Sequence, residues 1–459
     1  MLGIHPANEQ LARPLGLASA VALVVGEVIG VGIFLTPAAM ANALGSPFWI
    51  LAVWLTMGTM ATLGALSYGE LAARYPDSGG GYVYLREAFG PTTGFLYGWK
   101  CFIVMDPGLT AALAIGLARF VREGTGSSAV SEQAIAVAAI VTIASVNLAG
   151  VRLGAAVLRV TTVLKLVALA TVIGWGFAAG LGDWHHFTPL FTQRDGSLIA
   201  PAALTGGLVA AFFSFGGWWD AAKLAGEVRD PERNVPRALV LGVIIVTMTY
   251  VLTSAAFLYL VPIEHGGNGA TFAARAGTIL FGAAGGRVFA GIVIVSILSS
   301  LMALMMTAPR VYFAMARDGC FPHALAAVHP RFGTPARAIV LQAALACVLV
   351  FVGSFDQIIA YFIFVTLAFV GLTVGALLVL RRCAPVGAAA SAPERAPRKP
   401  GSVVPPLLFL GLVMVFLVML AARSPREAAL GCLVVALGWP LHRALVRTDA
   451  SPPTPRAHP

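Results

Sequence analysis

The stretch GEVIGVGIF, residues 26–34, places three glycines in the middle of a long apolar segment. A second stretch, FSFGGWW at residues 213–219, repeats this pattern with two adjacent glycines. Glycine inside a helix costs about 1 kcal/mol relative to alanine and leaves backbone groups exposed. The two stretches therefore predict two helices that are interrupted midway along an apolar segment.

The composition around these stretches is that of a membrane protein. Of the 459 residues, 58% are hydrophobic and 11% are charged, whereas soluble domains carry roughly 25% charged residues. The apolar residues fall in blocks of about 20, the length at which a helix crosses a hydrocarbon core of ~30 Å. We therefore predict an all-α polytopic membrane protein with about twelve spans. The predicted spans are residues 15–41, 46–72, 94–120, 131–149, 157–180, 200–221, 237–261, 285–308, 336–354, 357–380, 403–422 and 427–446.

The net charge of +10 follows from topology and does not indicate nucleic-acid binding. With the N-terminus in the cytoplasm, Lys and Arg residues on the cytoplasmic side outnumber those outside by about three to one, as the positive-inside rule requires. Lys100 and Lys165 fall within spans, whereas Lys223 falls in the predicted cytoplasmic loop 222–236. We expect a multi-pass protein of the inner (plasma) membrane with both termini in the cytoplasm.

The two interruptions fall in the first and the sixth predicted span, which is the spacing of two five-span halves. Paired interruptions in matching positions are typical of inverted-repeat transporters. The predicted segments are a cytoplasmic N-terminal segment 1–14, a first repeat 15–180, a second repeat 200–380, a cytoplasmic Ala/Pro-rich linker 381–402, two further spans in 403–446, and a disordered cytoplasmic tail 447–459.

An interrupted helix in a membrane has a chemical use. Non-helical backbone is tolerated at membrane depth only where protein or a water-filled cavity satisfies it. Free N–H groups and free carbonyl groups at such a break match the carboxylate and the ammonium that every amino acid carries. One alternative stays open: these glycines only allow close helix packing, since small residues line helix contacts in membranes.

Four motifs, in order along the chain, carry a resemblance to a known family. They are VGEVIGVGIFLTP (25–37), SGGGYVYLREAFG (78–90), FGGWWDAAKLAGEVRDPERNVPRAL (215–239) and APRVYFAMARDGCFPHALAAVHPRFGTPARAI (308–339). The chain resembles the amino acid–polyamine–organocation superfamily, and is most similar to its L-type amino acid transporter branch and bacterial relatives. The resemblance implies the leucine-transporter fold, in which five plus five helices form an inverted repeat and two extra helices follow.

The resemblance also implies a substrate site. The backbone amides of Val31 and Gly32 are expected to receive the carboxylate of an amino acid, and the carbonyl groups of Val28 and Phe213 to accept from its ammonium. Gly216 is expected to add a main-chain contact, and the ring of Phe213 to act as a lid. Main-chain dipoles suit this role because an unpaired ion is costly in a medium of low dielectric constant.

Three positions depart from the family pattern. Val31 stands where a serine is frequent, so the backbone amide is left without a hydroxyl beside it. Trp219 stands where close relatives tend to carry a smaller polar residue, and it restricts the side-chain volume of the substrate if it faces the pocket. Met302 replaces an asparagine.

The side-chain selectivity of the pocket is left open by the sequence. An apolar pocket wall, which favours neutral substrates, is predicted from Phe213, Phe215, Trp218, Trp219 and Met302. Glu27 or Asp106, if either faces inward, favours cationic amino acids or polyamines instead.

Lys165 lies deep in the fifth predicted span, within TTVLKLVALATVIGWG. A lone cation there is costly and commonly functional, although its long stem also permits snorkelling to the interface. The resemblance implies that Lys165 takes the place of the sodium ion of sodium-coupled relatives, between the carbonyl of Gly26 and Ser300. A permanently charged Lys165 suits a sodium-independent exchanger or facilitator, whereas a Lys165 that loses and regains its proton suits proton-coupled symport.

Other charges lie within or beside predicted spans. Glu27 is a possible proton or cation site, because carboxylates in membranes commonly mark such paths; it could also pair with Lys165. Glu70 and Glu227, at cytoplasmic helix ends, are predicted to form structural or gating ion pairs with arginines. Asp106 could cap the kink at the proline that follows it without a role in transport, and the sequence leaves its role open.

Other functional classes are not supported by the residues. The glycines of GEVIGVG follow no strand, so they do not indicate a dinucleotide site. No Ser/His/Asp grouping indicates an enzyme, and no charge ring or repeated filter sequence indicates a channel. The five cysteines are scattered, which predicts packing residues rather than a metal site or a disulfide framework. We expect no enzymatic activity, no cofactor and no metal.

The expected partners are an amino acid substrate and the lipid bilayer. Animal members of the branch join a heavy chain through a cysteine in the external loop between spans three and four, and the loop 122–132 contains no cysteine. We therefore expect no disulfide-linked heavy chain and no nucleic acid, and a protein that works as a monomer or a homo-oligomer.

Overall fold

The computed structural model describes residues 11–126, 129–193, 197–264, 272–352, 355–383 and 401–448. Within them, every regular element is a helix. Most of the predicted terminal segments and of the linker 381–402 lies outside the described residues. The α-helices are α1 (Leu17–Val28), α2 (Gly32–Leu44), α3 (Pro47–Arg74), α4 (Gly81–Phe89), α5 (Pro91–Lys100), α6 (Asp106–Thr125), α7 (Glu132–Leu148), α8 (Val151–Ala178), α9 (Pro201–Phe215), α10 (Pro231–Leu260), α11 (Phe272–Phe281), α12 (Gly285–Thr307), α13 (Pro309–Arg317), α14 (Ala336–Val352), α15 (Phe355–Cys383), α16 (Val404–Arg423) and α17 (Pro425–Thr448). The π segment is η1 (Cys101–Met105), and the 3₁₀ segments are η2 (Trp184–Phe187), η3 (Trp218–Glu227), η5 (Gly282–Ala284) and η6 (His323–Ala326).

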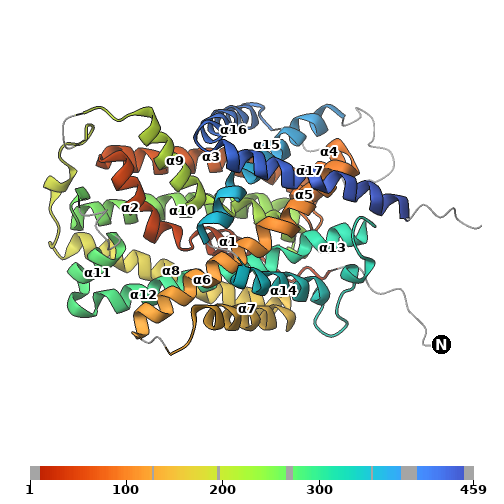
Figure 1. Cartoon of the computed structure of the whole chain (residues 1–459), viewed down its shortest axis with the longest axis horizontal. Helices are drawn as coiled ribbons and strands as arrows, with labels where there is room; N and C mark the ends of the chain where they lie inside the picture. Colours follow the sequence, from red (N-terminus) through yellow and green to blue (C-terminus); the bar gives the residue numbers. More distant parts are fainter. Residues whose placement is uncertain are drawn as a thin grey trace, which may run out of the picture.

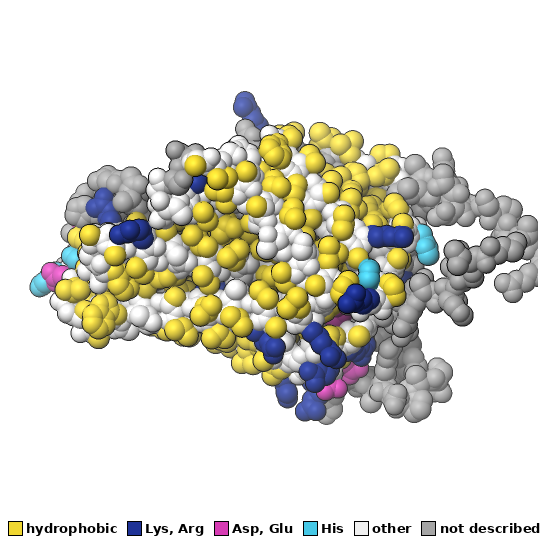
Figure 2. Space-filling model, turned by 90° about the horizontal axis from the view of Figure 1, so that it is seen from below, with side chains coloured by type: hydrophobic (Ala, Val, Ile, Leu, Met, Phe, Trp, Pro, Cys, Tyr) yellow, Lys and Arg dark blue, Asp and Glu magenta, His cyan; other side chains and the backbone are white. Residues whose placement is uncertain are grey.

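Helix length and surface character identify a multi-pass membrane protein. Among the described residues, eight helices are long and apolar enough to cross a membrane, or nine when the bent pair α1 and α2 counts as one span. Three shorter apolar helices lie at Glu132–Leu148, Ala336–Val352 and Ala428–Arg443. Hydrophobic side chains cover much of the face in Figure 2, with Lys and Arg gathered toward its edges. Each predicted span overlaps one of the described helices or helix pairs.

Both predicted interruptions are confirmed. α1 ends at Val28 and α2 begins at Gly32, with a bend of 42° between them. α9 ends at Phe215, and the chain continues through Gly217, whose φ of 103° is a left-handed conformation that glycine adopts without strain. Each break therefore lies at the glycines that predicted it.

The predicted end of the sixth span at residue 221 is wrong. After the second break the chain continues as η3 and stays buried to Glu227. The prediction ended the span early because Lys223 and Glu227 are typical of a loop. Both side chains are instead neutralised by ion pairs inside the protein, so the segment needs no contact with water.

The glycines of the first break also permit close packing. A β-carbon on Gly26 would lie 2.7 Å from Cδ1 of Leu158, and one on Gly32 would lie 2.5 Å from Oγ of Ser214. The glycines therefore interrupt the helix and also allow close helix packing, so the packing interpretation is correct as well.

The two breaks face each other inside the bundle. Figure 1 shows α1 near the centre of the molecule, where it packs against α8, α10 and α12. Across the breaks, α2 packs against α9 and α1 packs against η3. Other extensive contacts join α3 with α10, α6 with α12 and α7 with α14.

The chain before α1 is tied to the chain after η3. The amide of Leu15 donates to the carbonyl of Glu227 at 3.1 Å, and the amide of Arg229 donates to the carbonyl of Leu15 at 2.7 Å. These bonds form a parallel bridge between Leu15 and Val228. The two broken spans are therefore connected at the end of the molecule where the first span begins.

Candidate functional site

A cavity of about 50 Å³ lies between the two breaks. A volume of this size holds a few water molecules. The lining residues are Glu27, Val28, Gly30, Val31 and Gly32 at the first break, Phe213, Ser214, Gly216, Gly217, Trp219 and Asp220 at the second, Met105, Leu109 and Leu113 near and on α6, and Ser300 and Leu304 on α12. All five residues predicted to bind the substrate belong to this lining.

A second cavity, of about 190 Å³, continues from the first. It shares Val31 and Leu113 with the first cavity and extends along α6 to Arg119 and Glu123. The site between the breaks therefore has a neighbouring space toward the C-terminal end of α6.

The first break presents free backbone donors to the cavity. Within the described residues, the amides of Val31 and Gly32 donate to no backbone or side-chain acceptor. Both lie at the N-terminus of α2, where the helix dipole also favours a negative charge. Such a helix end is suited to bind a carboxylate.

The carbonyl of Val28 is already engaged. It accepts from the amide of Gly30 at 2.8 Å and lies 2.8 Å from the hydroxyl of Tyr250. The same hydroxyl lies 2.8 Å from the carbonyl of Ser214, so Tyr250 on α10 links the two breaks. At the second break, the carbonyl of Phe213 accepts from the amide of Gly216 at 3.3 Å.

Lys165 reaches the first break from α8 and is fully buried, so the snorkelling interpretation is wrong. Its ammonium donates to the carbonyls of Gly26 at 2.8 Å and Ile29 at 2.5 Å, and to that of Ser296 at 3.5 Å. The hydroxyl of Ser300 donates to the same carbonyl of Gly26 at 2.9 Å. The three residues predicted for coupling therefore meet at one point, with α12 reached mainly through Ser296 and Ser300.

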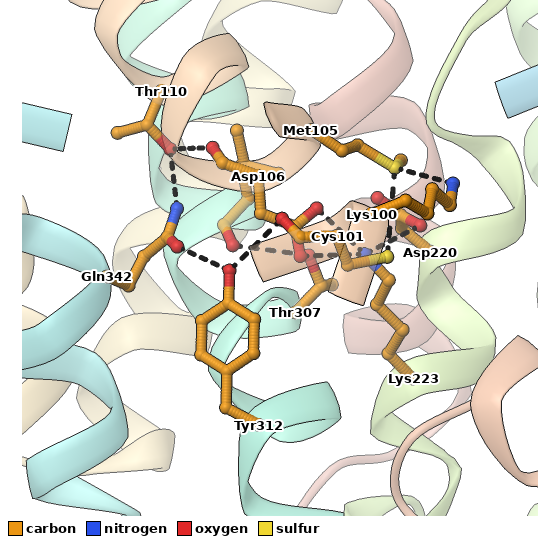
Figure 3. Close-up of polar contacts among 11 residues, drawn as sticks. Lys100, Cys101, Met105, Asp106, Thr110, Asp220, Lys223, Thr307, Tyr312 and Gln342 are labelled. Carbon is orange, nitrogen blue, oxygen red and sulfur yellow. Dashed lines mark hydrogen bonds and ion pairs between the residues drawn. The ribbon is translucent and has the colours of Figure 1, made fainter. Parts of the chain in front are cut away.

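A second group of charges lies between α6 and η3 (Figure 3). The ammonium of Lys223 lies 3.2 Å from Oδ1 of Asp106 and 3.1 Å from Oδ1 of Asp220. All three side chains are buried. The prediction of Lys223 as a loop cation is wrong, because its charge is neutralised in the interior. Asp106, for which capping of the kink was one interpretation, is an ion-pair partner of this cation.

The helix around Asp106 is widened into the π segment η1. Pro107 has no N–H and its ring crowds the preceding turn, and a π turn accommodates such a residue. One turn further along α6, the hydroxyl of Thr110 accepts a hydrogen bond from Gln342 at 3.0 Å. Gln342 in turn accepts one from the hydroxyl of Tyr312 at 2.7 Å. This chain of hydrogen bonds, visible in Figure 3, joins α6 to α13 and α14 beside the charged group.

Glu27 lines the cavity from the last turn of α1. No N–H or hydroxyl donor of the described residues reaches its carboxyl oxygens. Its charged neighbours are Asp220, which lies next to it, Lys223 and Asp106. The predicted pair of Glu27 with Lys165 is not formed, because the ammonium of Lys165 is directed at backbone carbonyls.

Two broken helices whose free backbone groups face one cavity suit a ligand with both a carboxylate and an ammonium. The family model for amino acid permeases matches residues 15–431. The chain belongs to this family. The match includes both breaks and nearly all of the described helices. It confirms the resemblance to the amino acid–polyamine–organocation superfamily that the four motifs predicted.

The permease is similar to several known amino acid transporters. It is 32% identical over 384 residues to the serine/threonine exchanger SteT of Bacillus subtilis (strain 168), with 83% of this chain and 86% of that protein covered. It is 30% identical over 383 residues to the b(0,+)-type amino acid transporter 1 of Oryctolagus cuniculus, with 82% and 78% covered. It is 28% identical over 456 residues to the cystine/glutamate transporter of Homo sapiens, with 96% and 87% covered. The permease is therefore a membrane transporter of amino acids.

The predicted apolar wall of the permease is only partly correct. Phe213 and Trp219 line the cavity. Phe215 and Trp218 instead pack against other aromatic rings outside its lining, and Met302 accepts a hydrogen bond from an asparagine of α7 at 3.1 Å. Gly216 follows the end of α9 and Trp219 lies in the first turn of η3, and both border the cavity.

The predicted ion pairs of the permease are confirmed. Glu227 receives two hydrogen bonds from the buried Arg310, at 2.7 and 3.2 Å. Glu70 pairs with Arg74 at 2.7 Å and also with Arg381. Both glutamates lie near the end of the molecule that carries the Leu15–Val228 bridge, so this end of the permease is closed by ion pairs as well as by main-chain bonds.

Four residues of the site were not predicted. Asp220 and Lys223 form an oppositely charged pair directly after the second break, and that spacing was a usable signal. Tyr250 places a phenolic hydroxyl in the interior of a predicted span, where it requires a hydrogen-bond partner. Ile29 takes part only through its carbonyl, so no side-chain pattern could reveal it.

Proposed function

We propose that this permease transports amino acids across the inner membrane by alternating access, as an exchanger or a facilitator, and without sodium. The observation that carries the proposal is the ammonium of Lys165, which lies among the carbonyl oxygens of Gly26, Ile29 and Ser296. Carbonyl oxygens are also what a bound monovalent cation requires at a broken helix. A lysine in that place supplies the charge permanently, so no sodium ion has to arrive with the substrate.

The main chain at the two breaks holds the substrate. Its carboxylate binds the free amides of Val31 and Gly32, and its ammonium binds the carbonyl of Phe213, with a further contact at Gly216. The carbonyl of Val28 joins only when Tyr250 releases it. The ring of Phe213, which lines the cavity, closes over the ligand.

The architecture in this proposal has twelve spans. Residues 15–180 and 200–380 form two inverted repeats, and residues 403–446 add two further spans. Each half begins with a broken span. The extensive contacts of α3 with α10, α6 with α12 and α7 with α14 each join a span to the one five positions later, which supports the repeat.

The proposal places both termini in the cytoplasm. The Leu15–Val228 bridge and the buried Glu227–Arg310 pair then close the cytoplasmic end. The second cavity, which extends from Val31 to Glu123, lies on the outer side. The structure thus resembles a state in which substrate arrives from outside.

Counterflow in proteoliposomes tests this function. Purified permease is reconstituted into vesicles loaded with unlabelled amino acids, and a labelled amino acid is added outside in sodium or in choline buffer. We expect equal accumulation in both buffers and stimulation by internal substrate. Uptake that requires an inward sodium gradient rejects sodium independence, and uptake of no amino acid rejects the function itself.

Proton-coupled symport through Lys165 is a second candidate, favoured by one observation. No carboxylate of the described residues lies within ion-pair distance of the Lys165 ammonium, so no fixed anion holds its proton. In this case an inward proton gradient drives accumulation into vesicles that contain no substrate. Under the exchange mechanism such vesicles accumulate nothing above equilibrium.

A further inference from the structure

The cavity has charged groups that recognition of the amino acid backbone does not use. Its two main-chain sites, at Val31 and Phe213, account for a carboxylate and an ammonium. Glu27, from the last turn of α1, and Asp220, from the first turn of η3, line the same cavity. Glu27 is 7% exposed and Asp220 is fully buried. Two buried carboxyl groups therefore remain for some other part of a ligand.

These carboxyl groups outnumber the cations that form ion pairs with them. Lys223 is shared between Asp106 and Asp220, so one cation faces two carboxylates. Glu27 adds a third carboxylate with no donor among the described residues. Two other buried cations lie nearby. Lys100 lies 4.8 Å from an aromatic ring centre and Lys165 donates to backbone carbonyls, and neither forms an ion pair with the described carboxylates.

The position of Glu27 fits a ligand rather than a structural partner. Gly217 has no side chain, and a β-carbon there would lie 3.0 Å from Cγ of Glu27. The carboxyl group is therefore pressed against the second break, beside Asp220. Two adjacent carboxylates in a medium of low dielectric constant repel each other unless a cation or a proton lies between them. A ligand that brings a cation with several N–H donors supplies both the charge and the missing hydrogen bonds.

We infer that Glu27 and Asp220 bind the cationic side-chain group of the substrate, so that the permease favours lysine, ornithine or arginine over neutral amino acids. The inference rests on the proposed function, because the main chain at the breaks must hold the backbone of the same ligand. Trp219, which lines the same cavity, contributes an aromatic ring that also attracts cations.

The test compares two ligands that differ only in the charge. L-norleucine has the four-carbon side chain of L-lysine without its ammonium. The binding of each is measured as thermal stabilisation of the purified permease, for the native protein and for Glu27→Gln, Asp220→Asn and Asp183→Asn. Asp183 is an exposed carboxylate that accepts a hydrogen bond from the amide of His185, so it serves as the matched control.

We expect the native permease to bind lysine at least tenfold more tightly than norleucine. Glu27→Gln should weaken the binding of lysine at least tenfold and change the binding of norleucine by less than twofold. Asp183→Asn should change the affinity for neither ligand. Retained norleucine binding shows that a variant is folded. Asp220→Asn could unfold the protein because Lys223 loses an ion-pair partner. Glu27→Gln still tests the inference in that case, because no donor of the described residues binds Glu27 and its replacement breaks no hydrogen bond.

The failures are distinguishable. Equal or tighter binding of norleucine by the native protein overturns the inference and leaves amino acid transport standing. A further outcome is transport that depends on pH in the native protein but not in Glu27→Gln. That result, together with equal or tighter binding of norleucine, shows that the carboxyl pair binds a proton, and it also overturns the inference. Binding of no amino acid at all overturns the proposed function together with it.

Discussion

Gly32 and Ser214 approach so closely that a β-carbon on residue 32 would lie 2.5 Å from the serine Oγ and 2.9 Å from its Cα. The two broken spans therefore touch almost main chain to main chain at the edge of the cavity. Beside this contact, the hydroxyl of Ser214 lies 2.6 Å from that of Thr36, which adds a hydrogen bond between the same two spans. Movement of one span relative to the other must change this contact.

Gly32→Ala is expected to abolish substrate binding and to destabilise the protein. The added methyl group overlaps Ser214, and overpacking of this kind costs about 1–3 kcal/mol. The spans must separate, which moves the amides of Val31 and residue 32 away from the carboxylate position. Thermal unfolding and ligand-induced stabilisation measure the two effects.

Gly291→Ala is the matched control, because nothing lies within 4 Å of a β-carbon at that position of α12. Gly32→Ala combined with Ser214→Gly should recover only part of the loss, since the Cα of residue 214 still lies in the way. Full activity of Gly32→Ala alone would contradict the close contact.

Lys165→Met is expected to reduce exchange at least tenfold. It removes the closest donor of the carbonyl of Ile29 and leaves that of Gly26 with Ser300 alone, and an unsatisfied buried polar group costs about 1–3 kcal/mol. Counterflow measures the loss. Thr161→Ala, one turn earlier on α8, breaks hydrogen bonds only within its own helix and should leave exchange unchanged. Native rates in Lys165→Met would show that the lysine only fills space.

Arg310→Met is expected to lower the melting temperature by several degrees. Glu227 would be left buried and unpaired, and breaking one partner of a buried pair costs about 3–5 kcal/mol. Arg310→Met combined with Glu227→Gln should recover most of the stability, because no unpaired charge remains. If the double variant is no more stable than Arg310→Met, the ion pair is not the cause.

Trp219→Ala is expected to enlarge the cavity and to shift binding toward amino acids with larger side chains. Trp219 lines the cavity, whereas its neighbour Trp218 faces other aromatic residues. A panel of ligands tested by thermal stabilisation measures the shift, with Trp218→Phe as the control. An unchanged ranking in Trp219→Ala would mean that another residue limits the volume.

The fold was largely predictable because its signals are local. Hydrophobic blocks set the spans, and the glycines at 30, 32, 216 and 217 mark the breaks. The end of the sixth span was predicted wrongly because sequence alone cannot show that the charge of Lys223 is met by Asp106, more than a hundred residues earlier. Pairing across the fold decides whether a charged residue belongs to a loop or to the interior.

The site was predictable to a similar extent. The backbone positions at Val31 and Gly32 follow from the breaks themselves, and Lys165 follows from its depth in an apolar span. The wall was predicted less well, because Phe215 at the end of α9 and Trp218 at the start of η3 pack against other aromatic rings, and the sequence around the break does not show which residues face the cavity. The neighbourhood of Glu27 and Asp220 depends on how two distant spans cross, which no local pattern contains.

The bridge between Leu15 and Val228 uses only main-chain atoms. Its strength is therefore insensitive to salt, to pH and to most substitutions at those two positions. The bridge couples the movement of the two segments that it joins. The chain at the start of α1 can move away from the end of η3 only if both hydrogen bonds break. A proline at residue 15 or at residue 229 would remove one of the two N–H donors and weaken the bridge, and prolines at both positions would abolish it.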